Sequence, residues 1–356
     1  MFSKNFKINN NFVGQKFPTY FIADIAANHD GSLQKAIDLI NIAAENGAQA
    51  AKFQHFAAKT IVSDVGFKKL INLKTHQSKW KESVYKVYEK ASIDLKWTKI
   101  LINECKKLKI DFFTSPYSLE LVDYIDEYVP AYKVGSGDIT WHDIVIHMAK
   151  KQKPMIIATG ASDIFEIDKV LKITKKINTK IALLQCNTNY TASLENFKYI
   201  NLNVLKTFKK KYKNLIYGLS DHTPGHSTVL GAIALGAKII EKHLTDKNNR
   251  SGPDHKFSMN PKSWKEMISR SRELELSLGS IEKKVENNEK NSVIVQRRSI
   301  RASRDIKKND KIDIKDLDFL RPCPPNSLKP YEYKKILGKK TKKNIKKGDM
   351  ISLDIF

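Results

Sequence analysis

The sequence predicts an α/β protein built on a TIM (β/α)8 barrel, with a small second domain after it. Short apolar segments of strand length alternate eight times with longer amphipathic segments, which is the pattern of parallel βα units. These repeats occupy about 280 residues, the usual size of such a barrel. The first βα turn, AANHDGS, lacks the G-x-G-x-x-G of a dinucleotide-binding sheet, which disfavours an open doubly wound fold.

The eight predicted strands are apolar runs that end in polar residues. They cover Tyr20–Ala27, Ala50–Phe56, Asp111–Tyr117, Ala131–Gly137, Pro154–Gly160, Lys180–Asn187, Leu215–His222 and Lys238–Thr245. Helical periodicity predicts helices at Leu33–Asn46, Leu95–Leu108, His142–Lys150, Ile164–Ile177, Ser227–Leu235 and Lys262–Leu278. The stretch Ile61–Ile93 is too long for an ordinary βα loop, so we expect an inserted lid or interface segment there.

The pattern changes after Gly279. We assign residues 1–280 to the barrel, 281–296 to a linker and 297–356 to the second domain. In this last part, apolar and polar residues alternate over short segments. The PCPP run at 322–325 prevents a helix there. With about 60 residues, the domain is near the lower size limit for independent folding, so we expect it to pack against something.

Composition excludes several classes of protein. The chain is 41% hydrophobic and 28% charged, as in ordinary globular proteins. No apolar run approaches the roughly 20 residues of a membrane helix, and the first residues lack the apolar core of a signal peptide. We therefore expect a cytoplasmic protein without a membrane partner. Three scattered cysteines, Cys105, Cys186 and Cys323, fit neither a disulfide framework nor a Cys-x-x-Cys metal site.

The formal net charge of +25 comes mainly from scattered lysines. Of the 63 basic residues, 55 are Lys spread over the whole chain and only eight are Arg, all in the last third. Nucleic-acid-binding surfaces combine clustered basic residues with aromatic ones, and this chain lacks that arrangement. We therefore expect no nucleic-acid partner, and an anionic small substrate remains compatible with the charge.

Polar residues end all eight predicted strands, and the active site of a TIM barrel lies at these carboxyl ends. Lys52 and Lys133 follow the second and fourth strands. Hydroxyl groups that end neighbouring strands belong to Thr114, Ser136 and Ser220, with Thr159 as a further candidate. Ammonium and hydroxyl donors that converge in this way predict a pocket for phosphate and carboxylate. The alternative for each lysine is a side chain directed to solvent.

Two histidines, His222 and His243, end the adjacent seventh and eighth strands. Two imidazoles with open coordination positions suit a catalytic divalent metal such as Mn, Fe, Co or Zn. Asp24 at the end of the first strand is a candidate third ligand or metal-linked carboxylate. The alternative for either histidine is a core or capping role.

Other polar residues near the predicted strand ends have two interpretations each. His29 contacts substrate or caps the following helix, and Asp254 binds substrate or fixes its loop. His255 sits in the same loop, at the edge of the expected cleft. We assign His76, along with His142 and His147, to the surface or to packing.

Nine motifs occur in the order and spacing of a known enzyme family. They are IADIAANHDG (22–31), KFQ (52–54), FFTSPY (112–117), YKVGSGDI (132–139), ATG (158–160), LLQCNTNY (183–190), GLSDHT (218–223), IIEKHLTD (239–246) and GPDHKFSMNP (252–261). Together they resemble the bacterial sialic acid synthase family, which makes N-acetylneuraminate, legionaminate and pseudaminate. The tail from Arg297 is similar to the β-rich C-terminal antifreeze-like (SAF) domain of that family.

The resemblance implies a metal-dependent condensation of phosphoenolpyruvate with N-acetylmannosamine or a related N-acyl hexosamine. The products would be a nine-carbon 2-keto sugar acid and phosphate. Matching motif positions would bind phosphoenolpyruvate through Lys52, Thr114, Lys133, Ser136 and Ser220, and would place Gln54, Thr188, Tyr190 and Asp254 on the substrate side. Asp24, His222 and His243 would be catalytic.

The resemblance also implies a cofactor and an assembly. His222 and His243 would hold a divalent ion, Mn²⁺ in the first place, with Mg²⁺, Co²⁺, Fe²⁺ or Zn²⁺ as alternatives. The family forms domain-swapped homodimers. Arg298 would therefore reach the partner barrel and bind the N-acyl group of the sugar, with Arg297 or Arg301 as alternatives.

The sequence departs from the family pattern at three positions. Asp24 stands where the family has Glu, which moves the carboxylate by about 1.5 Å. Ala158 replaces a Ser, and LLQCNTNY replaces the more usual LLHCT-N-Y arrangement. We interpret these differences as a branch with an altered acceptor sugar.

Two other functions remain as alternatives. A related synthase acting on a phosphorylated aldose, with an eight-carbon product, needs a further anion site and no C-terminal domain. A non-catalytic basic binding protein would have no use for the lysine and histidine pairs.

Overall fold

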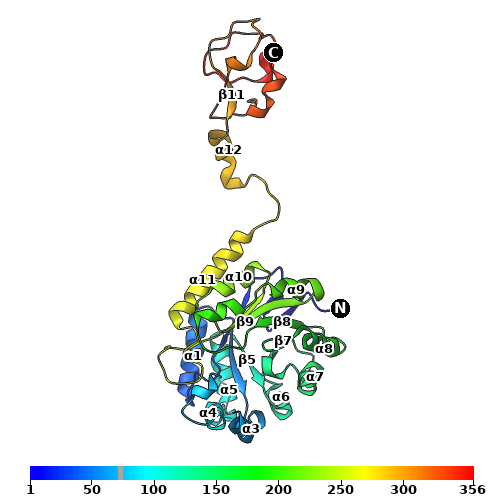
Figure 1. Ribbon diagram of the computed structural model, residues 1–356, viewed down its shortest axis with the longest axis vertical. Coiled ribbons are helices and arrows are strands. Elements are labelled where there is room, and N and C mark those ends of the chain that lie inside the picture. The colour runs from blue at the N-terminus through cyan, green and yellow to red at the C-terminus, as the bar shows by residue number, and fades with distance from the viewer. Residues whose placement is uncertain (71–74) are drawn as a thin grey trace. The chain divides into compact units, whose positions relative to one another are not determined.

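The computed structural model describes residues 1–70 and 75–356, and it consists of two compact units (Figure 1). The first unit is Met1–Gly279 and the second is Ser280–Phe356. Each unit has its own cluster of buried apolar residues. Within the described residues, no helix is long and apolar enough to cross a bilayer.

The first unit is a ring of parallel strands with helices on its outside (Figure 1). Eight strands are hydrogen-bonded in the order β5-β4-β3-β10-β9-β8-β7-β6, and β5 and β6 lie against each other to close the ring. The strands are β3 (Tyr20–Asp24), β4 (Ala50–His55), β5 (Asp111–Pro116), β6 (Tyr132–Val134), β7 (Met155–Ala158), β8 (Ile181–Cys186), β9 (Ile216–Asp221) and β10 (Ile239–His243). The predicted TIM barrel is therefore confirmed.

Helices follow the strands around the barrel. They are α1 (Leu33–Glu45), α5 (Thr98–Lys107), α6 (Leu119–Ile125), α7 (His142–Lys150), α8 (Ile164–Thr174), α9 (Val204–Lys211), α10 (Ser227–Ala234) and α11 (Pro261–Leu278). Local signals set several of their ends: Asp163 and Glu166 form a capping box at the start of α8. The sequence analysis missed α6 and α9; the seven residues of α6 give only two turns of periodicity.

Strand register decides which side chains enter the barrel. Asp24 pairs with Lys52, Gln54 with Ser115, and Ser220 with both Cys186 and Glu241. Paired residues of neighbouring strands point to the same face, and successive residues of one strand alternate. The inward set near the carboxyl ends is thus Asp24, Lys52, Gln54, Ser115, Lys133, Ala158, Cys186, Ser220, His222, Glu241 and His243.

A hairpin covers the opposite end of the barrel. It consists of β1 (Asn5–Ile8) and β2 (Asn11–Gly14), which pair antiparallel. The amides of Asn9 and Asn11 donate to the Asp111 carboxylate at 2.7 and 2.9 Å, and the Tyr20 hydroxyl donates to it at 2.6 Å. Asp111 and Tyr20 begin their strands, so the hairpin occupies the amino ends and leaves the carboxyl ends open.

The predicted insertion Ile61–Ile93 lies between β4 and α5. It contains α3 (Asp64–Lys69) and α4 (Val84–Ala91), and α2 (Ala58–Ile61) precedes it. Helices α2 and α3 pack against α4. Part of the insertion, residues 71–74, lies outside the described residues.

The first α-helix of the second unit is α12 (Lys290–Gln296), inside the segment that we predicted as a linker. It continues with β11 (Ser299–Ala302) and β12 (Leu317–Leu320), which form an antiparallel pair. Isoleucines such as Ile300, Ile336 and Ile351 are fully buried in its core. Its regular strands are few, and isolated bridges between loops complete the β-rich structure.

Candidate active site

A pocket of about 420 Å³ opens at the carboxyl ends of the barrel strands. Small-molecule sites typically measure roughly 300–1,000 Å³. Every one of the eight strands contributes at least one side chain to its lining, and the insertion contributes others. Of the predicted site residues, those that line it are Asp24, Lys52, Gln54, Lys133, Ser136, Thr188, Tyr190, Ser220, His222, His243 and Asp254.

Two buried lysines and two buried carboxylates form the floor of the pocket. Lys52 Nζ lies 2.6 Å from Asp24 Oδ2 and 3.8 Å from Glu241 Oε2. Lys133 Nζ lies 3.5 Å from Glu241 Oε1. Burial alone would raise the pKa of Glu241, but the charges of Lys133 and Lys52 outweigh it and lower that pKa to about 2. Both lysines are therefore held as buried cations within reach of an anionic ligand.

Hydroxyl groups surround these lysines. Ser220 Oγ donates to Glu241 Oε1 at 2.9 Å, and Ser136 Oγ accepts from the Gly160 N–H at 3.0 Å. Ser115 Oγ is buried and has no hydrogen-bond partner, and the same holds for Glu241 Oε2. Buried polar atoms in folded proteins are normally paired. Unpaired atoms at the floor of a pocket indicate a place where a ligand completes the network.

Gly160 has no side chain, and this absence leaves space for three polar side chains that lie close to its backbone. A Cβ atom there would lie 1.9 Å from Thr188 Oγ1, 2.9 Å from Ser136 Oγ and 3.0 Å from Cys186 Sγ. Only glycine lets these groups converge on the chain at this point. The structure therefore brings the lysines and these hydroxyls together at one pocket floor, and their binding of an anion stays a prediction.

Thr114 does not belong to this pocket, which corrects the sequence-based assignment. Its Oγ1 lies 2.9 Å from His55 Nδ1, and His55 Nε2 in turn lies 3.0 Å from Thr98 Oγ1 of α5. Alternation along β5 turns Thr114 outward to the helices and Ser115 inward. Thr159 is also directed elsewhere, because its hydroxyl donates to the Leu184 carbonyl at 2.9 Å.

The two predicted metal ligands lie side by side in the pocket. The ring centroids of His222 and His243 are 5.3 Å apart. His222 Nδ1 donates to the Asn187 carbonyl at 3.1 Å, which directs Nε2 away from it. His243 Nδ1 is buried without a hydrogen-bond partner. Burial lowers the pKa of His243 to about 3, against the opposing effect of Asp254. The neutral imidazole of His243 is the form that binds metal ions.

Carboxylates lie near this histidine pair without completing a metal site. Asp24 Oδ2 is 3.4 Å from His243 Nε2, and Asp254 Oδ2 is 3.8 Å from His243 Nδ1. Over residues 1–70 and 75–356, no three His, Cys, Asp or Glu side chains are arranged to hold an ion by themselves. Asp24 instead pairs with Lys52, so a metal at the two histidines needs water or substrate oxygen as further ligands.

Aromatic rings from the insertion continue the pocket above the histidines. The ring of Tyr190 lies 4.4 Å from that of His222 and 4.9 Å from that of His76. His76 is 5.5 Å from Trp80, which is 6.4 Å from Tyr88. The assignment of His76 to surface or packing is therefore wrong, because the insertion brings its ring to the pocket lining.

Several pocket residues lie at the predicted strand ends but received no role in the sequence analysis. Glu241, Ser115 and Cys186 were within the predicted strands. Counting two residues back from His243 leads to Glu241, whereas Ser115 follows only from the register of β5 with β4. Asp138 lines the pocket as well, and burial raises its pKa to about 6 against the lowering effect of Lys133.

Other polar candidates have structural roles. His29 neither lines the pocket nor caps the helix: its Nδ1 accepts from the Gly31 N–H at 3.1 Å within the turn, and Ser32 is the N-cap of α1. His255 joins two loops through Asp30 at 2.9 Å and Thr245 at 2.6 Å, and it does not line the pocket. Asp254 accepts from the Ala27 N–H, which fixes its loop, and it also lines the pocket, so its contact with substrate stays a prediction.

Arg298 belongs to the second unit. Its side chain is exposed, and Nη1 donates to the Phe319 carbonyl at 2.8 Å. Its contact with a partner barrel stays a prediction.

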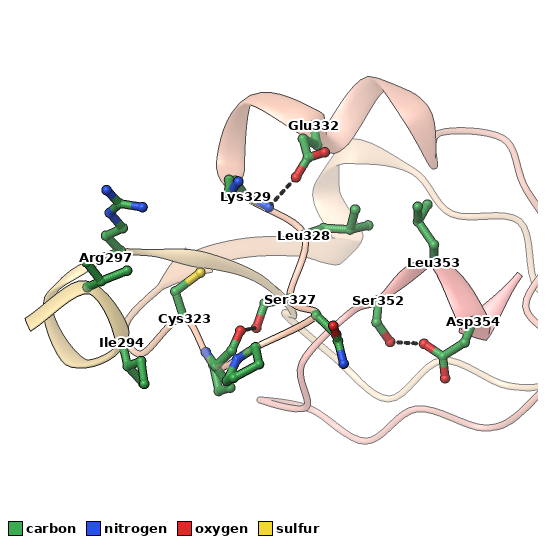
Figure 2. A pocket seen from close by; sticks show the side chains of 14 residues that line it. Ile294, Arg297, Cys323, Ser327, Leu328, Lys329, Glu332, Ser352, Leu353 and Asp354 are labelled. Atoms are coloured by element: carbon green, nitrogen blue, oxygen red, sulfur yellow. Dashed lines mark hydrogen bonds between the residues drawn. The ribbon is translucent and has the colours of Figure 1, made fainter. Parts of the chain in front are cut away.

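A second cavity, of about 710 Å³, lies within the C-terminal unit (Figure 2). Ile294 of α12 forms part of its wall. Its polar groups pair with one another: Ser327 Oγ donates to the Pro324 carbonyl at 2.6 Å, and Glu332 Oε2 accepts from the Lys329 N–H at 2.9 Å. No ionisable residue in its lining is buried. The barrel pocket is smaller, but its lining contains the buried lysines, carboxylates and histidines, so it is the candidate active site.

Comparison with known proteins agrees with this geometry. Residues 39–283 match the model of the NeuB family, and residues 297–355 match that of the SAF domain. The chain belongs to the NeuB family. Both the predicted family and the architecture of a barrel followed by an SAF domain are thereby confirmed, and membership of the NeuB family confirms that the protein is an enzyme.

Relatives of the NeuB family resemble the chain over nearly its whole length. N,N'-diacetyllegionaminic acid synthase of Campylobacter jejuni is 37% identical over 94% of this chain and 98% of its own. Pseudaminic acid synthase of the same species is 32% identical over 93% and 95%. The solved N-acetylneuraminic acid synthetase of Leptospira borgpetersenii has a TM-score of 0.71 at 26% identity, covering 82% of this chain and 96% of that one.

Proposed function

We propose that the protein condenses phosphoenolpyruvate with an unphosphorylated N-acyl hexosamine, giving a nine-carbon 2-keto sugar acid and phosphate. The observation that carries this proposal is the buried Lys52–Lys133 pair beside unpaired and converging hydroxyl groups. Phosphoenolpyruvate has a phosphate and a carboxylate on one small carbon frame, and it matches such a set of donors. The names of the relatives support the same reaction type.

Some pocket residues bind phosphoenolpyruvate, and Asp24 takes part in the reaction. Lys52 and Lys133, with Ser115, Ser136 and Ser220, hold the phosphate and carboxylate of phosphoenolpyruvate and fix its C3 toward the pocket mouth. C3 forms a bond to the aldehyde carbon of the open-chain sugar, and the aldehyde oxygen takes up a proton. Water adds to C2, and the bond between C2 and the phosphate oxygen breaks to release phosphate. Asp24 lies between Lys52 and His243, where its carboxylate accepts the proton of that water.

A divalent metal ion fits the histidine pair. The unpaired Nδ1 of His243 and the orientation of His222 by Asn187 support this assignment. Mn²⁺ or another divalent ion held by the two imidazoles would supply Lewis acidity for the aldehyde oxygen.

An acceptor without phosphate is favoured over a phosphorylated aldose. Within the described pocket lining, Lys52 and Lys133 are the only Lys or Arg side chains, and both lie on the floor. A phosphorylated sugar would need a further cation at the mouth. The buried ion pairs of the floor also argue against a non-catalytic basic binding protein. Burying charged side chains costs folding free energy, and a protein that used only its surface would not need them.

We also propose that the active enzyme is a domain-swapped homodimer, with Arg298 of one chain at the N-acyl group in the barrel of the other. The SAF domain match and the exposed position of Arg298 support this assembly.

The test is phosphate release by purified, metal-reconstituted protein. Phosphoenolpyruvate is offered with N-acetylmannosamine, a diacetamido-trideoxyhexose or arabinose 5-phosphate, each with and without EDTA. We expect release that requires metal and one of the unphosphorylated sugars. Turnover with arabinose 5-phosphate alone would establish the alternative function.

A further inference from the structure

A buried ion pair lies on the outer face of the two strands that carry the pocket histidines. Lys242 Nζ is 2.6 Å from Asp221 Oδ2, and the two side chains are 1% and 0% exposed. Side chains alternate along a strand, so Asp221 and Lys242 point outward where the next residues, His222 and His243, line the pocket. Charges are costly to bury, and the proposed reaction gives this pair no step.

The pair stands where the hydrogen-bonded pairing of the two strands stops. Asp221 and Lys242 are the last paired residues of β9 and β10, and β9 itself ends at Asp221. His222 is one residue beyond this last pair, whereas His243 still pairs with Asp24 of β3. The position of His222 therefore depends more on side-chain contacts than that of His243.

One ammonium group binds the chain on both sides of His222. Lys242 Nζ donates to the Asp221 carboxylate before it and to the Thr223 carbonyl after it, each at 2.6 Å. Lys242 is also the neighbour of His243 in the sequence. A single buried side chain therefore ties the backbone of one histidine to the strand that carries the other.

The carboxylate of this pair is fixed by further partners. Asp221 Oδ2 accepts from the hydroxyls of Thr223 at 2.8 Å and of Thr228 in α10 at 2.6 Å. Asp221 Oδ1 accepts from the Thr223 N–H at 3.2 Å. A buried network with this many partners is rigid, and it links the ends of both strands to the helix.

The histidine rings have fewer contacts of this kind. His222 Nδ1 pairs with the Asn187 carbonyl, but His243 Nδ1 has no hydrogen-bond partner among the described residues. Metal-binding histidines usually have their second nitrogen fixed by a hydrogen bond. With one ring fixed in this way, the separation of the two rings, 5.3 Å between centroids, depends on the backbone that carries them.

We propose that the Lys242–Asp221 pair is a positioning device, which holds His222 and His243 at the separation that a divalent metal ion requires. This inference rests on the metal site of the proposed function and adds two positioning residues to it. Neither residue belongs to the described pocket lining, so both act through the backbone of the histidines. Partners that orient metal ligands typically contribute about 10- to 100-fold to metal affinity.

The test measures Mn²⁺ binding by the full chain, from the electron paramagnetic resonance signal of the free ion. Asp221→Asn together with Lys242→Met removes both charges, so that neither is left buried and unpaired. We expect this double variant to bind Mn²⁺ with a Kd about 10- to 100-fold higher than that of wild type. At saturating Mn²⁺, its KM for phosphoenolpyruvate should equal that of wild type, because the pocket floor is unchanged.

Two results with the folded double variant would overturn the inference. One is an unchanged Kd for Mn²⁺, and the other is a KM for phosphoenolpyruvate that rises as much as the Kd, which would indicate a general distortion of the site. If the double variant does not fold, Thr228→Val removes one donor to Asp221 and should raise the Kd by a smaller factor. An unchanged Kd in that variant would then overturn the inference.

A matched control separates positioning from stability. Tyr20→Phe removes the 2.6 Å hydrogen bond to Asp111 at the opposite end of the barrel, so it should lower stability and leave the Kd for Mn²⁺ unchanged. An equal loss of Mn²⁺ affinity in Tyr20→Phe would overturn the inference. Absence of Mn²⁺ binding by wild type would overturn the proposed metal site as well, whereas binding by wild type with unaffected variants would overturn only the positioning role.

Discussion

Two neighbouring hydroxyls on β5 provide the sharpest test of how the anion pocket is built. Ser115 faces the pocket with an unpaired Oγ, whereas Thr114 faces outward and lies 2.9 Å from His55 Nδ1. Ser115→Ala removes a hydroxyl that has no hydrogen-bond partner within the protein and is available to a bound ligand. Thr114→Val keeps the side-chain shape and removes the hydrogen bond between β5 and His55 of β4, whose other ring nitrogen pairs with Thr98 of α5. The two changes should therefore affect different properties.

The expected magnitudes follow from these contacts. A hydrogen bond to a charged group contributes roughly 1.5–3 kcal/mol, which is about 10- to 150-fold in affinity. Ser115→Ala should raise KM for phosphoenolpyruvate by that factor and leave the free energy of unfolding nearly unchanged. Thr114→Val leaves the buried ring nitrogen of His55 without its partner, at a cost of about 1–3 kcal/mol. That loss lowers Tm by roughly 2–4 °C per kcal/mol, with KM unchanged.

The assay is phosphate release at varied phosphoenolpyruvate, with calorimetry or denaturant unfolding on the same preparations. Wild type and both variants are measured at saturating acceptor and metal. An increase in KM for Thr114→Val together with an unaffected Ser115→Ala would refute the register argument. Equal KM values for all three proteins would refute the assignment of the anion pocket to this face of β5.

Three further predictions concern the floor, the metal and the assembly. His222→Ala and His243→Ala should each remove bound metal, as measured by elemental analysis, and lower kcat by roughly 100-fold or more; full metal content in both would contradict the assignment. The pKa of Glu241 lies below its unfolded value, so its contribution to stability is present above about pH 4.3 and disappears as the pH falls toward about 2. Glu241→Gln should thus be less stable than wild type by about 3–5 kcal/mol at pH 7, and this difference should shrink below pH 4.3 in urea unfolding; a constant difference would show that its charge does not matter. Lys133→Ala and Arg298→Ala should each be inactive, while refolding them together should restore about a quarter of wild-type activity, because half of the dimers are mixed and each has one intact site. No recovery in confirmed mixed dimers would place Arg298 outside the partner's site.

Much of the fold follows from local sequence patterns. Each barrel strand lies within its predicted range, as with Tyr20–Asp24 inside Tyr20–Ala27, and α7 has its predicted bounds. Apolar runs and helical periodicity act over neighbouring residues, so they are visible without the tertiary structure. The same locality explains why the polar strand ends, the His222–His243 pair and the lysine pair were found. Short helices such as α6 escaped, because their periodicity is too brief.

The tertiary structure decided which of these polar residues meet. Thr114 and Ser115 are equally polar neighbours, and only the pairing of β5 with β4 turned one outward and the other into the pocket. Glu241 forms ion pairs with two lysines on other strands, which makes it part of the pocket floor. His76 lies against Tyr190, more than a hundred residues away in the sequence, which brings it to the pocket lining. The sequence determined which chemistry was available at the strand ends. Register and long-range packing, which depend on contacts between distant segments, selected the residues that share one site.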